Sequence, residues 1–543
     1  MKLMEFTHIK MSINSNSDSV REKAARDLGV DDEPKVVDLL IKLIKDQSPL
    51  VRRAAAESLG KTKSEKAFEP LVHALKDFNP GVRKSSTEAI GKLRLEKNAP
   101  ILAELLLDKD PDVRQAAEEG LVALGDLAVQ PTAKMITANN PDYARSSAIR
   151  ILARTRTPSA VQPLVYLFLN QSENLPLIAD ALRELKWKPT NAEEFVRYYL
   201  AIDHLDTIVK VGTKVLPALT FQLSTENKDI KLRAIKSIGM LKNSSALEKL
   251  MELLDCDDTD IRAAVIKSVG EIADPETTVP IIFTLNDESE EVVVAACEAL
   301  ANLKDSSSIS ALVKTSETNN YIEKSAAIRA LGQFDDPRAI SAMISGLHEK
   351  RHEVRKSSID ALIGLGSKTN VYFADCLTDN ESHVKRTGIM ALRQAMAVEY
   401  GNNIIKAILD KEYSVKREAI EALCAMNFIE ALPNIMRAVG DENNEVQIAA
   451  INALGEMGDA VYLEILVDCS FVDLLHDEAV RAIYKILQRD ADKAKNEDLE
   501  KIAQIKVTTS LTERNSLAGD VLKDEIDPSK INNMAKAELK KRE

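Results

Sequence analysis

The amino-acid sequence predicts an all-α fold, a right-handed α-solenoid in which short helical hairpins stack into a superhelix. The main observation is that a unit of two short amphipathic helices recurs every 31 residues along most of the chain, and a fixed period in this range is typical of stacked repeats. Aromatic residues make up only 4% of the sequence, which suits thin helical layers packed closely together. We therefore expect the 543 residues to form one array whose units contact mainly their neighbours, not several globular domains.

The repeating unit is clearest in residues 46–75. Its first helix places Val51, Ala55 and Leu59 on one face, and we expect Gly60 to end this helix as a C-terminal cap. Its second helix has similarly spaced apolar residues and a proline in the first turn, where a missing N–H costs little. Neither helix could bury its apolar stripe alone, so the units must stack to be stable.

The register of the repeats follows from the residue equivalent to Val51 in each unit, which we call the anchor. Nearly every step between successive anchors within a block is 31 residues, although the step from Val354 to Val384 is 30. So many positions in phase leave little room for another fold. The anchors are Val20, Val51, Val82, Val113, Ala144, Ile230, Ile261, Val292, Glu323, Val354, Val384, Val415 and Val446.

An acidic and a basic residue bracket the start of the first helix in many units. Aspartate stands five residues before the anchor, just ahead of the helix N-terminus, where an acceptor and a negative charge are both favourable. Arginine stands one residue after the anchor, and its forked guanidinium can bond neighbouring turns. Three consecutive pairs are Asp46 with Arg52, Asp77 with Arg83, and Asp108 with Arg114.

These residues resemble HEAT repeats, in particular the short alanine-rich type named after phycobilisome lyases, whose pattern is an Asp-containing turn followed by VRxxAAxALG. The resemblance covers roughly residues 15–490 and corresponds to about 15–16 HEAT-like repeats. It implies that the aspartates and arginines form a ladder between repeats, and that the anchor-bearing helices line the concave face. The resemblance specifies a fold but no activity, because many unrelated functions use this scaffold.

The repeat rhythm divides the chain into four parts. The step from Ala144 to Ile230 is 86 residues, which is not a multiple of 31. After residue 490 the sequence becomes rich in charge and lacks aromatic residues. The expected parts are N-terminal HEAT-like repeats (1–170), an irregular stretch or joint (171–229), C-terminal HEAT-like repeats (230–490), and a charged helical cap or partly disordered tail (491–543).

The irregular stretch carries the only tryptophan of the chain, Trp187, close in sequence to Phe195, Tyr198 and Tyr199. Two interpretations are open. These aromatic residues fill the core of a longer, irregular repeat, or they form a bend or docking surface, since exposed aromatic residues mark interfaces. On the second interpretation, Trp187 and Tyr198 contact a partner protein.

Composition restricts the classes of ligand and the compartment. The net charge of −13 and the pI of about 5.3 argue against non-specific binding to nucleic acid or to an anionic membrane surface. No apolar run is long enough to span a membrane, and the first residues lack the apolar core of a secretory signal. The five cysteines are far apart and form no CxxC pair, as expected of free thiols in the reducing cytoplasm.

The sequence contains no recognisable catalytic motif, so we expect neither an enzyme nor a cofactor. The pairs His348-Glu349 and His352-Glu353 resemble the iron-binding motifs of deoxyhypusine hydroxylase, a HEAT-like enzyme. Both pairs precede a single helix, however, whereas metal ligands must converge from several elements, so we predict no metal site. Nothing in the sequence indicates a tetrapyrrole site, which a bilin lyase would need.

Basic residues recur two positions after the anchor in three consecutive repeats, at Lys356, Arg386 and Arg417, and Arg329 lies in the repeat before them. Stacking would align these side chains into a strip. Either they are ordinary solvated residues balanced by nearby carboxylates such as Glu418, or they bind an acidic segment of a partner protein.

The function predicted from these observations is a non-enzymatic scaffold or adaptor that binds protein partners on the concave face. The alternative is a HEAT-like protein that binds nucleic acid on a concave basic face. Less favoured alternatives are an iron-dependent enzyme like deoxyhypusine hydroxylase and a bilin lyase. We expect a cytoplasmic protein that does not insert into membranes.

Overall fold

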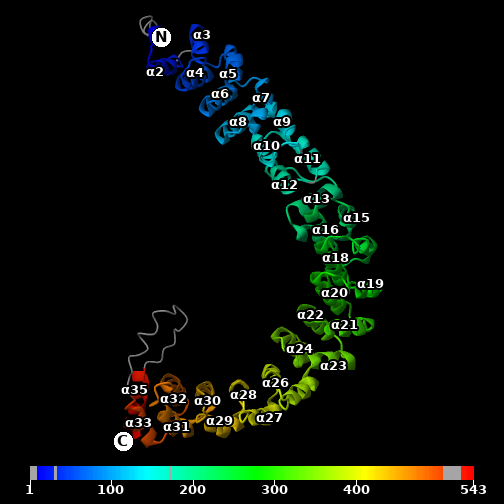
Figure 1. The fold of residues 1–543 in the computed structure, drawn as a ribbon, viewed down its shortest axis with the longest axis vertical. Helices are drawn as coiled ribbons and strands as arrows, with labels where there is room; N and C mark the ends of the chain where they lie inside the picture. The colour runs from blue at the N-terminus through cyan, green and yellow to red at the C-terminus, as the bar shows by residue number, and fades with distance from the viewer. Residues whose placement is uncertain (1–8, 30–33, 138, 172, 506–527, 543) are drawn as a thin grey trace. The chain divides into compact units, whose positions relative to one another are not determined.

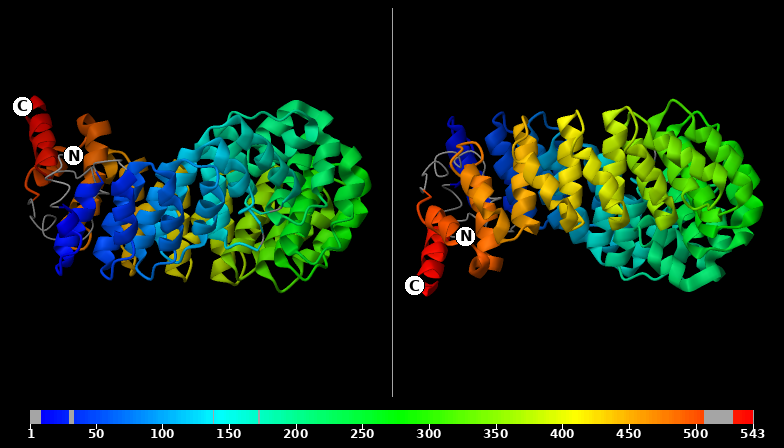
Figure 2. Two further views of the ribbon diagram at one scale, coloured as in Figure 1. Left: turned by 90° about the horizontal axis from the view of Figure 1, so that it is seen from above. Right: turned by 90° about the horizontal axis from the view of Figure 1, so that it is seen from below.

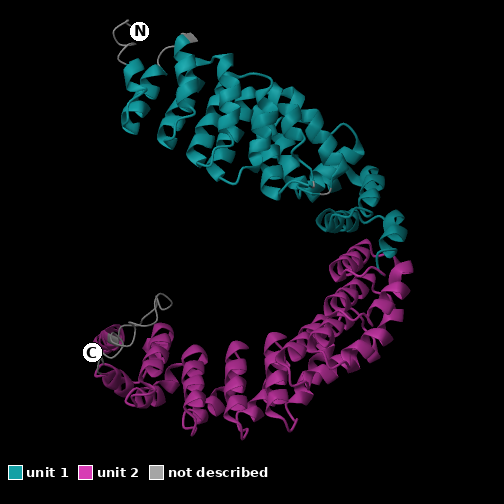
Figure 3. Ribbon diagram, turned by 45° about the horizontal axis from the view of Figure 1, so that its top comes forward, with its two compact units in different colours: residues 1–254 teal, residues 255–543 magenta. Residues whose placement is uncertain are grey.

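The computed structural model describes residues 9–29, 34–137, 139–171, 173–505 and 528–542, which fold into helices with no β-strand among them (Figure 1). Successive helices alternate between two stacked layers, so the prediction of an all-α solenoid is confirmed. The chain divides into two compact units, residues 1–254 and residues 255–543 (Figure 3), and each is described by itself.

In unit 1 the even-numbered helices carry the anchor residues and pack against one another in one layer, while the odd-numbered helices form the second layer. The even layer contains α2 (Asp18–Leu28), α4 (Pro49–Thr62), α6 (Pro80–Leu93), α8 (Pro111–Leu124), α10 (Asp142–Thr155), α12 (Leu175–Glu184), α14 (Leu205–Val211) and α16 (Lys228–Leu241). The odd layer contains α3 (Pro34–Leu43), α5 (Phe68–Ala74), α7 (Asn98–Glu104), α9 (Asp126–Ala133), α11 (Val161–Asn170), α13 (Ala192–Ala201), α15 (Leu216–Gln222) and α17 (Leu247–Met251).

Unit 2 repeats this arrangement, and its even-numbered helices lie on the inner side of the curve that the unit makes (Figure 1). Seen from below, its yellow and orange helices stand side by side (Figure 2). The even layer contains α18 (Thr259–Ile272), α20 (Glu290–Leu303), α22 (Tyr321–Leu331), α24 (His352–Gly364), α26 (Ser382–Gln394), α28 (Tyr413–Ala425), α30 (Asn444–Met457) and α32 (His476–Asp490). The odd layer contains α19 (Thr278–Thr284), α21 (Ile309–Ser316), α23 (Pro337–Leu347), α25 (Asn370–Cys376), α27 (Gly401–Ala407), α29 (Leu432–Ala438), α31 (Leu463–Cys469) and α33 (Asn496–Ile502).

The last described helix, α35 (Pro528–Arg542), packs against α32 and α33 at the end of unit 2. Arg542 holds it there, because the guanidinium donates to the backbone carbonyls of Ala491, Asp492 and Ala494. A helical segment therefore covers the end of the array. The prediction of partial disorder in the tail concerns residues 506–527, which lie outside the described residues.

The glycine expected to end the first helix of the unit has a different role. Helix α4 continues past Gly60 to Thr62, and Lys63 ends it in the left-handed conformation, with φ of 51°. Gly60 is buried where α4 and α6 approach most closely, and a Cβ atom there would lie 2.7 Å from the Cα of Ala89. The glycine is needed for close packing between repeats, not for termination.

The irregular stretch is filled by packed hairpins. The 86 residues between Ala144 and Ile230 hold two further helices of the even layer, α12 and α14, so three short or long steps replace regular ones. Phe168, Trp187 and Tyr198 meet edge to face, with ring centroids 5.7–6.4 Å apart. This arrangement corresponds to the first interpretation, in which the aromatic residues form a core.

Candidate functional site

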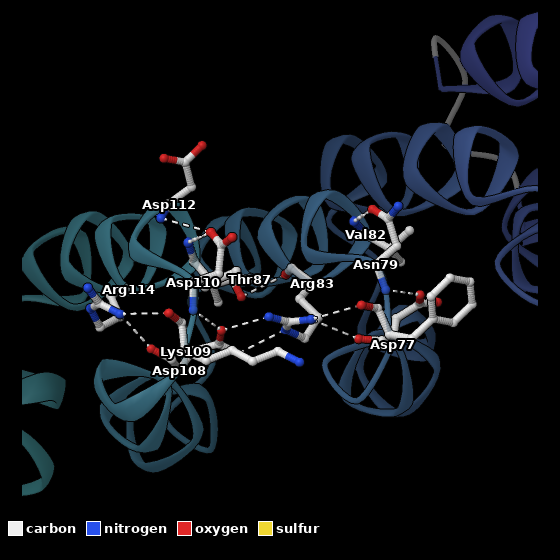
Figure 4. A network of polar contacts seen from close by, with 12 residues as sticks. Asp77, Asn79, Val82, Arg83, Thr87, Asp108, Lys109, Asp110, Asp112 and Arg114 are labelled. Carbon is white, nitrogen blue, oxygen red and sulfur yellow. Dashed lines mark hydrogen bonds and ion pairs between the residues drawn. The ribbon is translucent and has the colours of Figure 1, made fainter.

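A ladder of charged hydrogen bonds joins the turns that precede the even-numbered helices. In its best-defined step, Arg83 donates from Nε and Nη2 to the two carboxylate oxygens of Asp108, over 2.9 and 2.8 Å (Figure 4). The Nη1 of Arg83 also donates to the backbone carbonyl of Asp77, six residues earlier, over 3.0 Å. One arginine thus joins the turn of its own repeat to that of the next repeat.

The ladder recurs with a constant separation of 25 residues between the basic and acidic partner. The Arg52 fork to Asp77 measures 2.7 and 2.9 Å, and both side chains are nearly buried. Lysine replaces arginine in the later repeats of unit 2. The ion pairs are Arg21–Asp46, Arg52–Asp77, Arg83–Asp108, Arg262–Asp287, Lys324–Glu349, Lys385–Asp410 and Lys416–Asp441.

The ladder lowers the pKa of its aspartates. For Asp46 the hydrogen bond from Arg21 is the largest cause of the lowered pKa. For Asp77, burial works to raise the pKa, but the hydrogen bonds from Arg52 and from the N–H of Asn79 outweigh it, so the pKa is lowered. These carboxylates therefore favour the charged form in the folded protein.

Two arginines at the ladder position have no carboxylate partner among the described residues. The residue 25 positions after Arg114 is Asn139, and the Arg114 guanidinium lies over the ring of Tyr143 instead, 4.9 Å from its centroid. The residue 25 positions after Arg355 is Asn380, because this repeat is one residue short. Arg355 donates only to the backbone carbonyls of Glu349 and Lys350.

The predicted basic strip lies on three consecutive helices of the even layer, α24, α26 and α28, with Lys356, Arg386 and Arg417 at the same offset in each. The Lys356 side chain is exposed and has no ion-pair partner among the described residues. Arg386 and Arg417 are about one-third exposed, at 38% and 34%. The three residues therefore reach solvent from the inner layer of unit 2.

Carboxylates lie among the arginines of this strip. Arg386 Nη2 is 3.8 Å from Glu418 Oε2, whereas Arg417 contacts Glu445 Oε2 at 2.6 Å and Glu421 Oε1 at 3.5 Å. Burial raises the pKa of Glu418, against the attraction of nearby arginines. Two of the three strip residues are thus already engaged, and the surface carries mixed charge, not a uniform positive one.

The remaining predicted partner-binding residues differ in their exposure. Arg329 is exposed on α22, with Nη1 3.4 Å from Ser357 Oγ on the next even-numbered helix. Trp187 is partly buried, and Tyr198 is only 6% exposed. Tyr198 packs with Phe168 and Trp187 in the core, so it lacks the exposed surface that a docking residue needs, and we correct this part of the prediction.

The histidines of the two His-Glu pairs lie apart from any metal-like cluster. His348 Nε2 is 3.6 Å from Asp379 Oδ2, and His352 is exposed at the start of α24. Within the described ranges, no three His, Cys, Asp or Glu side chains are arranged to hold a metal ion. In the same ranges, no helix is long and apolar enough to cross a membrane.

Sequence reasoning missed several charged residues that shape this region. Arg393 contacts Glu418 Oε1 at 3.3 Å, nine positions after the anchor of its helix. Arg197 is 9% exposed and donates to the carbonyls of Phe168 and Gln171, over 2.7 and 2.6 Å, which ties α13 to α11. Burial lowers the pKa of Arg197. The position of Arg393 repeats the glycine position of other helices, a signal that could have identified it.

Comparison with known proteins extends these observations. A family model for HEAT repeats matches residues 8–78, 63–122, 216–282, 279–363 and 402–484, which together make up more than half of the chain. A comparison with curated proteins gave no significant match.

Among solved structures, the chain is similar to one that describes Kap95p binding to RanGDP, with 12% identity and a TM-score of 0.39, over 99% of this chain and 88% of that chain. It is also similar to importin beta, with 13% identity and a TM-score of 0.36, over 98% and 87% of the two chains. At these values the similarities are no basis for a functional argument.

Proposed function

Because the chain belongs to the HEAT-repeat family, we propose that it is a non-enzymatic scaffold that binds partner proteins along the inner layer of unit 2. The observation that carries this proposal is the alignment of Lys356, Arg386 and Arg417 at one offset of three consecutive helices, each with solvent-accessible charge. Stacked repeats present such rows of side chains to extended segments. An acidic segment of the partner is the proposed ligand.

The mixed charge of the surface favours a protein over a nucleic acid. A duplex would bring its phosphates against Glu418, Glu421 and Glu445 as well as against the arginines, and each carboxylate would repel it. A protein segment can place carboxylates at the arginines and donors at the glutamates. Binding to nucleic acid remains the alternative, and a strong decrease in affinity for mixed-sequence DNA with added salt would favour it.

Two finer features belong to the same proposal. The 31-residue period and the alanines in the anchor-bearing helices support membership of the short alanine-rich type within the family. The five cysteines are all free thiols, and burial raises the pKa of Cys297 and Cys376 to about 12. Unreactive free thiols support a reducing compartment, and we propose the cytoplasm.

The proposal is tested by reversing the charge of the strip. Replacing Lys356, Arg386 and Arg417 together by Glu should leave the melting temperature nearly unchanged, since the ladder residues are untouched. Proteins recovered with the wild-type chain from its native cells, identified by mass spectrometry, should be lost from this variant. The matched control reverses three exposed lysines of the odd layer or its turns, Lys314, Lys368 and Lys406. Equal recovery by both variants would refute the proposed surface.

A further inference from the structure

A cavity of about 270 Å³ lies between α24 and α26 in the even layer of unit 2. Five of its lining residues carry basic side chains, and no lining residue is acidic. Arg355, Lys356 and Arg386 supply permanent or near-permanent positive charge, and the other two are histidines. The basic lining residues are His352, Arg355, Lys356, His383 and Arg386.

The cavity exists because this repeat departs from the regular geometry. The anchors Val354 and Val384 are 30 residues apart, and α24 and α26 pack less closely than the pairs on either side. In the preceding pair, Gly332 lets α22 come close to Ala361 of α24. The equivalent position of α24 is Ile363, whose side chain does not permit the same approach.

The shortened repeat also removes the ladder partner of Arg355. In Arg52, Arg83 and Arg262, Nε and Nη2 grip a carboxylate in a fork of 2.7–2.9 Å, while Nη1 bonds the preceding turn. Arg355 keeps the Nη1 bonds, at 2.8 and 2.7 Å, but no described carboxylate meets its fork. Asp379, one residue out of register, instead accepts from the N–H of Glu381 and lies near His348.

The neighbours of Arg355 reinforce the need for an anion. Burial lowers the pKa of Arg355, and so does repulsion from Arg386. The Nε of Arg386 is buried without a hydrogen-bond partner among the described residues. The nearest carboxylates stand beside the cavity, not in its lining: Glu381 is 3.8 Å from His383 Nδ1, and Glu418 is 3.8 Å from Arg386 Nη2.

We propose that this cavity binds the phosphate group of a phosphorylated residue in a partner protein. The inference rests on the proposed scaffold function and assigns the acidic ligand of that surface to a specific site. Arg355 takes the anion with the fork that its ladder counterparts use for aspartate, Arg386 donates from Nε, and Lys356 adds charge from the exposed side.

Phosphate matches this lining better than a carboxylate does. A phosphorylated side chain carries about −1.5 to −2 charges and three strong acceptor oxygens, whereas a carboxylate has one charge and two oxygens. Two guanidiniums, one ammonium and two imidazoles offer more donors than a single carboxylate can accept. The cavity is also too small for a helix, so it fits a side-chain terminus presented by an extended segment.

The test uses the full-length protein and isothermal titration calorimetry in a phosphate-free buffer. The probe is a short alanine-rich peptide with one phosphoserine, compared with the same peptide carrying serine or glutamate, with inorganic phosphate, and with a short oligothymidylate. The phosphopeptide should bind about tenfold more tightly than the glutamate peptide, as expected when a charge-assisted hydrogen bond is added. The serine peptide should show no measurable heat.

Single variants locate the binding. Arg386→Gln should weaken phosphopeptide binding by about tenfold, and Lys356→Gln should weaken it several-fold without affecting the fold, because Lys356 is exposed. Arg417→Gln is the matched control, since it has the same offset on the next helix but lies outside the cavity. It should change the affinity by less than about twofold.

Unchanged affinity in both Arg386→Gln and Lys356→Gln would overturn the assignment. Inorganic phosphate or oligothymidylate binding more tightly than the phosphopeptide would overturn the protein source of the ligand. If the phosphopeptide fails to bind while the triple charge reversal still loses its partner, the phosphate inference fails and the proposed function stands. Loss of neither would reject both.

Discussion

Arg52 and Asp77, 25 residues apart in the sequence, form a two-pronged ion pair with N···O distances of 2.7 and 2.9 Å. The pair is nearly buried and joins one repeat to the next. Arg53, the next residue, instead forms an exposed ion pair within its own helix, with Glu57. The same residue type at adjacent positions thus has two different structural roles.

Replacing Arg52 by Ala should therefore destabilise the protein more than replacing Arg53. Loss of Arg52 leaves the Asp77 carboxylate partly buried without its partner, which costs roughly 1–3 kcal/mol. Loss of the exposed Arg53 pair should cost less than about 0.5 kcal/mol. Urea unfolding of both variants measures the difference, and equal midpoints would contradict a load on the ladder.

The ladder also predicts a dependence of stability on pH. The pKa of Asp77 is lowered in the folded state, so its contribution is fully present above the unfolded pKa of about 3.9 and is lost as the pH falls through the folded value. The difference in unfolding free energy between the wild type and Asp77→Asn should be largest near neutral pH and shrink below about pH 4. The exposed Glu69→Gln serves as control, and a difference that grows with acid would contradict the assignment.

The contact between Gly60 and Ala89 gives a test that separates packing from helix propensity. Gly60→Ala should destabilise by about 1–3 kcal/mol, because the new Cβ would meet the Ala89 backbone. Gly364→Ala is the control, since no atom lies within 4 Å of its added Cβ. It should be neutral or stabilise by up to about 1 kcal/mol, as alanine favours helix over glycine. Thermal melts that rank the two variants in the opposite order would refute this role of Gly60.

These contacts indicate what the sequence could and could not predict. The 31-residue period predicted the stacked helices because each anchor, such as Val51 or Val82, must be buried between neighbours. The same pattern misassigned Gly60, because a glycine near a helix end suits both termination and close packing, and only the neighbouring helix distinguishes them.

Side-chain pairing across repeats was less accessible. The sequence placed Arg386 and Arg417 at one offset, but their contacts with Glu418 and Glu445 depend on the exact offset between helices. The missing partner of Arg355 follows from a single absent residue, visible in the spacing of the anchors and interpretable only once the separation of 25 residues is known.

The irregular stretch should depend on Arg197. Its guanidinium is buried and satisfies the carbonyls of Phe168 and Gln171, so Arg197→Ala should cost about 1–3 kcal/mol and expose the stretch to protease. Arg183→Ala is the control, because Arg183 forms only an exposed pair with Asp180. Limited proteolysis under native conditions should cut the first variant faster within residues 171–229. Equal cleavage rates would show that Arg197 does not hold the hairpins together.

The central claim is that partners bind on the even-numbered layer of unit 2. The most direct measurement places a photo-crosslinking amino acid at Lys356 in one variant and at Lys406, an exposed lysine of the odd-layer helix α27, in another. Irradiation in native cells, followed by mass spectrometry, should give partner crosslinks from position 356 and none from position 406. Crosslinks from position 406 alone, or equal yields of the same partners from both positions, would contradict the claim.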